Sequence, residues 1–323
     1  MDANELGTAL RSDLLATPGF WAYLRRHQRI GKWIIGSDYV LKNKEKPWDV
    51  MAFTLYPVLD GPHLDRLMRR LNEDIPKDIK EISIVNANDP VINLLRSDRY
   101  YSVAVMLSKN RHKLIGPDLV RKMIENSYEN ANNWVNRDHC LPSIKSIKNL
   151  LDETKKRNFN ATLLLNISYA SAVAATISGF LTSECNAELV TWVSDRDPIS
   201  EAYRKAYGTL FSVGHLNSCE ALNISASLTK LSLVHDDGAK PGQSAWFDPL
   251  IRMPDYLCGA ISSMDFQGNR LAPVRIKYKN ILDFATADNK NLLVCRMDIS
   301  NSPILKYPRI SSRVVILSST PQN

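Results

Sequence analysis

Acidic side chains stand at the ends of apolar strands and on one following helix. Asp38 lies in "KWIIGSDYV", Asp195 follows "ELVTWVS", Asp236 and Asp237 follow "LSLVH", and Asp255 lies in "RMPDYLCGAIS". Because α/β sheets bind ligands beyond the carboxyl ends of their strands, we expect these carboxylates to converge. Converging carboxylates repel one another, and Mg²⁺ or Mn²⁺, which prefer oxygen ligands, relieve that repulsion. The pattern predicts a two-metal-ion site that hydrolyses phosphodiester bonds.

Asp38 is expected on one face of its strand with Ile34 and Gly36, because alternate residues of a strand share a face. Gly36 carries no side chain, and we expect it to let a ligand approach the backbone there. In the alternative interpretation, the strand has ended before Asp38, which is then a turn residue.

Asp255 shares a helical face with Cys258, Gly259 and Ser262, which follow it by three, four and seven positions. This face of small residues predicts a helix that packs closely on the sheet and points Asp255 at the strand ends. The alternative is that Pro254 starts the helix, so that Asp255 only complements the helix dipole.

Two aspartates follow the strand "ELVTWV", and they are expected to differ in role. Asp197 precedes Pro198 and a helical pattern, which is typical of an N-cap. Asp195 has no such structural explanation and remains a candidate ligand. At the later strand end, either Asp236 or Asp237 could simply begin a turn.

The elements that would position these acids follow from the hydrophobic patterns. The predicted strands span 32–40, 50–57, 79–86, 100–110, 188–195 and 227–237, and one or two more lie in the tail after 270. The predicted helices fill the first thirty residues, 60–76, 87–97, 160–184, 198–211 and 248–264, with a polar helical segment over 111–158 and one helix in the tail. This order indicates an α/β sheet covered on both faces.

Composition is that of a soluble globular protein, with 44% hydrophobic and 23% charged residues among 323. The net charge of +7 favours polyanionic partners mildly, although a few extra solvated lysines explain it equally well. Five scattered cysteines without C-x-x-C spacing indicate reduced thiols in a cytoplasm. The uncharged stretch 159–183 contains asparagines and many hydroxyl residues, so we expect a buried central helix rather than a membrane span.

Basic clusters at Arg25–Arg29 ("RRHQR") and Lys155–Arg157 ("KKR") could contact a phosphate backbone. Taken alone, each cluster is more simply explained as a solvated helix face. His235, beside Asp236, is a candidate proton shuttle, although a lone histidine at a strand end is more often structural.

Several short motifs together resemble a known family. "GSDYV" supplies Asp38, "YYSVAVMLSKN" is a strand ending at Lys109, and "VTWVSDRD" supplies Asp195 and Arg196. In this order they resemble the bacterial and phage domain-of-unknown-function family numbered thirty-eight hundred, which has an RNase H-like fold. The last motif of that family, a strand ending in Asp followed by a helix with Q-x-A-D-x-x-A-G, is similar to "LVHDDGAKPGQSAWFDPLIRMPDYLCGAI".

The resemblance spans roughly residues 30 to 265 and implies an RNase H-like mixed sheet flanked by helices. It implies a helical extension at 1–30, the RNase H-like domain at 31–265 with the helical segment near 111–158, and a C-terminal extension at 266–323. The implied activity is a metal-dependent nuclease serving phage defence or a mobile element.

The resemblance also implies roles for single residues. Asp38, Asp195 and Asp255 would be catalytic metal ligands, Asp236 or Asp237 a further ligand, and Lys109 and Arg196 would contact phosphate. The family's acid–Ser–Gly after the first Asp is replaced here by Tyr39 and Val40, and Arg252 and Pro254 replace its usual Gln and Ala.

These departures motivate a second hypothesis, a degenerate RNase H-like module that binds nucleic acid or a protein partner without cleavage. A third is a small-molecule α/β enzyme, because acids at strand ends also hold sugars.

Overall fold

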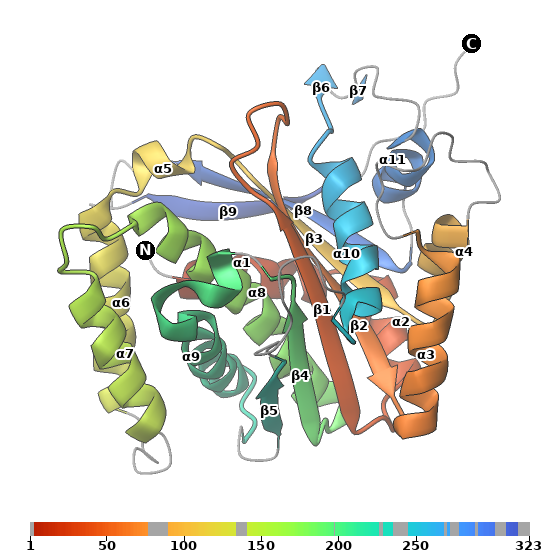
Figure 1. Ribbon diagram of the computed structural model, residues 1–323, viewed down its shortest axis with the longest axis horizontal. Helices are drawn as coiled ribbons and strands as arrows, with labels where there is room; N and C mark the ends of the chain where they lie inside the picture. The colour runs from red at the N-terminus through yellow and green to blue at the C-terminus, as the bar shows by residue number, and fades with distance from the viewer. Residues whose placement is uncertain are drawn as a thin grey trace.

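The computed structural model describes residues 3–76, 90–133, 141–196, 198–225, 229–234, 245–267, 270–271, 278–287, 290–300 and 308–315. Its strands are β1 (Lys32–Val40), β2 (Asp49–Val58), β3 (Tyr101–Leu107), β4 (Leu189–Ser194), β5 (Lys230–Leu233), β6 (Phe266–Gln267), β7 (Arg270–Leu271), β8 (Leu292–Ser300) and β9 (Arg309–Val314). Seven of the described strands form one sheet in the order β5-β4-β1-β2-β3-β8-β9 (Figure 1), and β6 pairs with β7.

The sheet is mixed, and its directions set which strand ends meet. β1, β2 and β3 form an antiparallel meander, with Asp38 opposite Ala52. β4 lies parallel to β1, with Gly36 opposite Val193, and β5 lies parallel to β4. On the other side, β8 is parallel to β3 and β9 is antiparallel to β8. The carboxyl ends of β1, β4 and β5 therefore lie at one edge, as a ligand site at strand ends requires.

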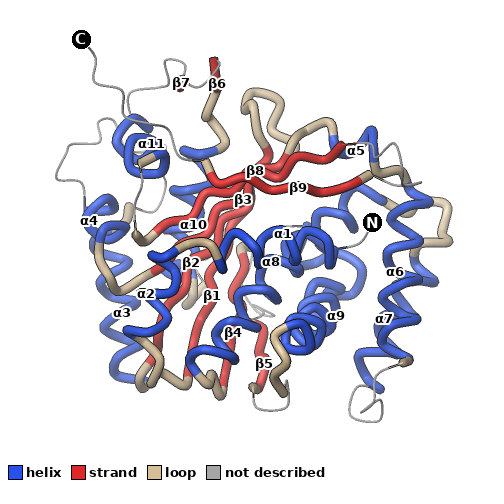
Figure 2. The backbone as a smooth tube through the Cα atoms, turned by 180° about the vertical axis from the view of Figure 1, so that it is seen from behind, coloured by secondary structure: helices blue, strands red, loops and turns tan. Residues whose placement is uncertain are grey.

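Helices cover both faces of this sheet (Figures 1 and 2). They are α1 (Ala3–Leu15), α2 (Pro18–Arg26), α3 (Gly61–Asp74), α4 (Pro90–Arg96), α5 (Arg111–Leu114), α6 (Pro117–Asn132), α7 (Leu141–Glu153), α8 (Ala161–Cys185), α9 (Pro198–Ala221), α10 (Asp248–Ile261) and α11 (Lys279–Thr286). One hydrophobic core joins the sheet to α1, α2 and α6 to α9. A second core on the opposite face joins it to α3, α4, α10 and α11. The α/β class with a sheet flanked by helices is thus confirmed.

Helix α8 is the central helix of the first core. An Asn160 side chain caps its start by accepting from Leu163 N–H, and Asn186 ends it in the left-handed conformation. It is the one described helix long and apolar enough to cross a membrane, and 94% of its most apolar window is buried. This burial is that of the core helix of a soluble protein and confirms the interpretation of the uncharged stretch.

Most predicted elements are found where the patterns place them, and β1 matches its predicted span. The strand predicted at 79–86 lies outside the described residues. Helix α9 begins at Pro198 as predicted, but Tyr203, Arg204 and Lys205 have positive φ and interrupt it with a kink. α10 begins at Asp248, so that Pro254 lies inside the helix.

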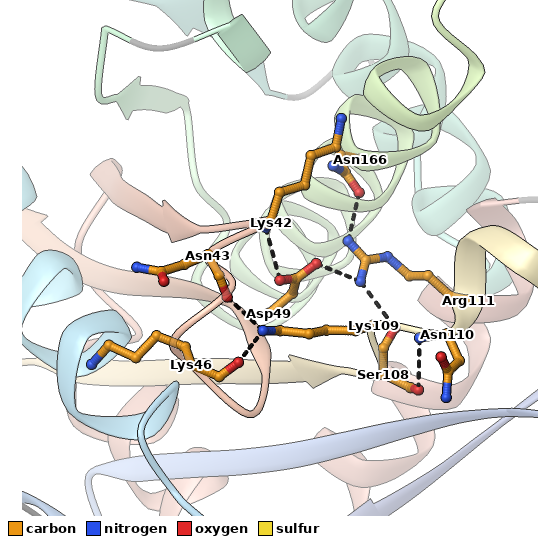
Figure 3. A network of polar contacts seen from close by, with 9 residues as sticks. All are labelled: Lys42, Asn43, Lys46, Asp49, Ser108, Lys109, Asn110, Arg111 and Asn166. Carbon is orange, nitrogen blue, oxygen red and sulfur yellow. Dashed lines mark hydrogen bonds and ion pairs between the residues drawn. The ribbon is translucent and has the colours of Figure 1, made fainter.

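A buried ion pair joins the first residue of β2, Asp49, to the first residue of the short helix α5, Arg111 (Figure 3). Arg111 Nη1 lies 2.7 Å from Asp49 Oδ2, and the two side chains are 0% and 1% exposed. Arg111 also donates to Ser108 O at 3.0 Å and to Asn166 Oδ1 of α8 at 2.9 Å. The Lys42 amide donates to the other carboxylate oxygen. Both members of the pair thus have further hydrogen bonds, which buried charges require, and Arg111 Nε alone has no partner among the described residues.

His215 of α9 is buried against α8 as a neutral base. Ser178 gives its hydroxyl proton to Ala175 O, so its oxygen accepts from His215 Nδ1 at 2.8 Å. The Cys219 thiol lies 3.4 Å from His215 Nε2, which is left as the acceptor. Burial lowers the pKa of His215 to about 4.

We expect this histidine to make the fold acid-sensitive. In the unfolded chain this histidine has its ordinary pKa near 6.5, so below pH 6.5 it gains a proton there, whereas in the folded protein it stays neutral down to about pH 4. The free energy of unfolding that is present above pH 6.5 is therefore lost as the pH falls from 6.5 toward 4. The free energy of unfolding should fall by about 2–3 kcal/mol between pH 7 and pH 4.5 through this group. Urea denaturation of wild type and His215→Gln at both pH values measures it. Equal pH dependence in the two proteins would contradict the assignment.

Candidate functional site

Asp38 lies within β1 and is 8% exposed. Ile34, two positions before Gly36, packs in the core around α10, whereas Ile35 packs in the core around α8. Alternation along the strand therefore places Asp38 on the α10 face. The turn interpretation of Asp38 is wrong, because the strand continues to Val40 and Asp38 keeps its ladder position opposite Ala52.

Gly36 serves the close approach of a helix rather than of a ligand. A Cβ at this position would lie 2.3 Å from Leu250 O of α10. The same carbonyl accepts from Tyr56 Oη at 3.0 Å, which fixes the helix on the sheet. The expectation of a ligand at Gly36 is therefore corrected: the backbone of α10 fills the space, and the small face of that helix presses on β1 as predicted.

Replacing Gly36 by alanine should destabilise the protein by about 1–3 kcal/mol, because the added methyl overpacks a rigid backbone contact. Gly61, at the start of α3, is the matched control, since a Cβ there would meet nothing within 4 Å. Urea denaturation of Gly36→Ala and Gly61→Ala compares them. Equal stability of the two variants would show that α10 can move away from β1 without loss.

Asp255 lies in the second turn of α10, because the helix begins at Asp248. The alternative in which Pro254 starts the helix is therefore wrong. One turn later, the Cys258 thiol donates to the backbone carbonyl of Asp38 at 3.0 Å. Burial raises the pKa of Cys258 well above its ordinary value, and the charges of Asp38 and Asp255 raise it further. Both carboxylates thus lie near the same buried thiol.

Asp195 follows β4 directly, next to Asp38 on the neighbouring strand. Its backbone N–H donates to Ser37 O at 3.3 Å, so the parallel ladder reaches it. Val193, two residues earlier, packs in the core around α10, and alternation places Asp195 on that side as well. Its carboxylate accepts from Arg196 N at 2.7 Å, and its carbonyl accepts from Ser200 Oγ at 3.0 Å.

Three of the predicted acids fall outside the described residues: Asp197, Asp236 and Asp237. The strand before Asp236 and Asp237 is β5, which ends at Leu233. The next residue, Val234, donates its N–H to Trp192 O of β4 at 3.1 Å. The strand that precedes Asp236 therefore ends at the same edge of the sheet as β4.

The two predicted phosphate contacts, Arg196 and Lys109, both have partners within the protein. Arg196 Nη2 lies 3.5 Å from Asp248 Oδ1 at the start of α10. Lys109 Nζ donates to the carbonyls of Asn43 and Lys46 in the β1–β2 loop (Figure 3). Lys109 thus holds this loop against the end of β3, and its contact with phosphate stays a prediction.

The β1–β2 loop is a feature of this edge that the sequence patterns did not single out. It follows Asp38 by a few residues and carries Lys42, Lys44 and Lys46. Lys42 and Lys44 are exposed, while Lys46 donates to Gly259 O of α10 at 2.9 Å. The alternation of lysines in "LKNKEK" was the available signal, since a basic loop beside acids is suited to a phosphate-bearing substrate.

The site therefore combines carboxylates of β1, β4 and α10 with a basic loop. Within the described residues, no three His, Cys, Asp or Glu side chains are gathered into a group that could hold a metal ion. The donors at this edge are carboxylate oxygens, which in kind suit Mg²⁺ or Mn²⁺. Comparison with known proteins finds no family model, no curated protein and no solved structure that matches this chain.

Proposed function

We propose that the protein is a metal-dependent nuclease that hydrolyses phosphodiester bonds at the carboxyl edge of β1 and β4. The observation that carries this proposal is the hydrogen bond from the Cys258 thiol of α10 to the Asp38 carbonyl, which brings Asp38 next to the turn of α10 that carries Asp255. Asp195 stands beside Asp38 on the adjacent parallel strand. Carboxylates at the carboxyl ends of neighbouring parallel strands lie where α/β sheets bind their ligands.

The sheet supports an RNase H-like fold for the residues from β1 to α10. Five strands in the order β3-β2-β1-β4-β5 combine an antiparallel meander with two strands parallel to β1. The acids lie on the first strand, after the fourth and on the helix after the fifth, as the resemblance implies. The same proposal includes a biological role of this nuclease in phage defence or in a mobile element.

Asp38, Asp195 and Asp255 would hold Mg²⁺ or Mn²⁺, with Asp236 or Asp237 as a further ligand. Bound there, such ions would activate water and stabilise the leaving oxygen. The lysines of the β1–β2 loop and Arg196 would attract the phosphate backbone and orient it over the carboxylates. Cytoplasmic location is part of the proposal and is supported by four described cysteines that are free and buried.

The test is cleavage of single- and double-stranded DNA and RNA by the wild-type protein in Mg²⁺ or Mn²⁺. We expect cleavage of at least one substrate in the presence of the ion and none in the presence of EDTA. Undiminished cleavage in EDTA, or intact substrates under all these conditions, would contradict the proposal.

A module that binds nucleic acid or a protein partner without cleavage is the second candidate. Two residues that the family resemblance singles out have structural roles here. They are Arg252, which replaces the family's usual Gln, and Lys109, for which the resemblance implies a contact with phosphate. Arg252 Nη1 donates to Asn72 O and Ile75 O and so ties α10 to the end of α3. Lys109 Nζ donates to two carbonyls of the β1–β2 loop. Nucleic-acid binding without cleavage in Mn²⁺ would favour this candidate.

A further inference from the structure

A pocket lies at the opposite edge of the sheet from the carboxylates. Its volume is about 380 Å³, and it is formed where the end of α2, the end of β2, α3 and the start of β3 meet. Small-ligand pockets are typically about 300–1,000 Å³. This edge is marked by the pairing of Lys32 with Val58, six residues along β1 from Asp38, or about 20 Å at strand spacing. The pocket is therefore separate from the carboxylate site.

The lining is strongly basic. Arg66 and Arg70 come from α3, Arg99 precedes β3, and His27 and His63 complete the polar part. Among the described residues that line the pocket there is no Asp or Glu. Arg70 Nε lies 3.4 Å from Asp74 Oδ2, and because both side chains reach solvent, water and salt screen this pair. A cluster of guanidinium groups without lining acids is suited to an anion, and arginine in particular binds phosphate with paired hydrogen bonds.

The histidines of this pocket are held in place by the surrounding elements. His27 Nε2 donates to Asp98 O at 3.2 Å, and its ring lies 4.8 Å from that of Tyr23. The His63 amide donates to Asp60 Oδ1, which caps α3. The Nδ1 atom of His63 is buried and has no hydrogen-bond partner within the described part of the chain. His63 therefore contributes its ring to the pocket wall, while this nitrogen is shielded from solvent.

The remaining walls are apolar and do not suit a bare inorganic anion. Leu59, at the end of β2, is 60% exposed, an unusual position for a large apolar side chain beside arginines. Ile30, Pro57 and Leu67 continue this surface. Tyr100 is 5% exposed and its ring is fixed against Tyr56 at 5.4 Å. A ligand that fills this pocket therefore has a planar or apolar part next to its negative charge.

We propose that this pocket binds a nucleoside monophosphate, either free or as the terminal nucleotide of a nucleic-acid strand. Arg66 and Arg70 hold the phosphate, and the base lies against Leu59 and Pro57. Guanidinium groups also stack on the faces of bases, so Arg99 serves both parts of the ligand. One residue of the basic cluster "RRHQR", His27, thereby has a place in a binding pocket.

Isothermal titration calorimetry in EDTA tests the pocket without any contribution from a metal site. The probes are adenosine and uridine 5′-monophosphates, adenosine, inorganic phosphate, and one oligonucleotide with either a 5′-phosphate or a 5′-hydroxyl. We expect the monophosphates to bind, and Arg66→Gln and Arg70→Gln each to weaken binding by at least about tenfold, as loss of a charge-assisted contact predicts. Preference for the phosphorylated oligonucleotide over free nucleotide would identify a strand end as the natural ligand, and the reverse preference a free nucleotide.

Arg69→Gln is the matched control, because Arg69 is exposed on the same helix and does not line the pocket. It should leave the affinity unchanged. The proposal is overturned if adenosine or inorganic phosphate binds as tightly as the monophosphate, or if no monophosphate binds. Equal weakening by Arg69→Gln and Arg66→Gln would also overturn it, because only general charge attraction would then remain.

Discussion

Replacing Asp49 by alanine should lower the free energy of unfolding by about 3–5 kcal/mol, because it leaves a buried guanidinium without its counter-charge. Arg111 is 0% exposed, and its remaining partners, Ser108 O and Asn166 Oδ1, are neutral. The loss also removes the carboxylate that accepts from the Lys42 amide. Urea denaturation with linear extrapolation measures the change.

The exposed pair of Arg26 and Asp98 is the control for this prediction. Its atoms are as close, at 2.6 Å, but the side chains are 50% and 58% exposed. Asp98→Ala should therefore cost no more than about 1 kcal/mol. The double variant Asp49→Leu with Arg111→Met should recover much of the loss, since a buried pair is often replaceable by apolar side chains of similar volume. A loss below 1 kcal/mol for Asp49→Ala would show that Arg111 finds solvent or another partner.

Asp38→Asn should reduce metal-dependent cleavage by about 100-fold or more, if the proposed nuclease activity is present. The amide keeps the size of the side chain but removes the charge that would hold the cation, and each 1.4 kcal/mol of lost transition-state stabilisation is tenfold in rate. Asp255→Asn should act in the same direction, because Asp255 lies one turn before Cys258, whose thiol contacts the Asp38 backbone. Initial rates on one substrate at fixed Mn²⁺ provide the comparison.

Asp65→Asn is the control for that experiment, because Asp65 is an exposed carboxylate on α3. It should cleave at the wild-type rate. Thermal melts with and without Mn²⁺ supply a second measurement: the metal-induced rise in melting temperature should shrink in Asp38→Asn and persist in Asp65→Asn. Wild-type cleavage by Asp38→Asn would remove this residue from the proposed site, whatever the melts show.

The two sites proposed here depend on different kinds of information. The carboxylates could be proposed from short motifs, because a strand end is a local feature and the edge at which parallel strands end follows from simple rules. The pocket at the other edge joins His27, Arg66 and Arg99, which lie far apart in the sequence. No local pattern places them together, so the basic cluster at Arg25–Arg29 is ambiguous until the tertiary structure brings the end of α2 and helix α3 to the same end of the sheet.

The sequence by itself determined the elements whose patterns are strong and local. β1 follows from a short run rich in Ile and Val, α8 from a stretch without charges over 159–183, and the start of α9 from Pro198; each depends on neighbouring residues alone. The packing of α10 against β1 was also predicted, in outline, from the small face of that helix.

Only the tertiary structure decided what each residue faces. Gly36 proved to accommodate the Leu250 carbonyl, and Asp49 proved to pair with Arg111 although 61 intervening residues separate them. Pro254 was compatible with the start of a helix, yet the helix runs through it, because α10 is held along β1 by contacts at both Leu250 and Cys258. Such contacts join segments distant in the chain, and their free energy comes from packing and desolvation, which a local pattern does not contain.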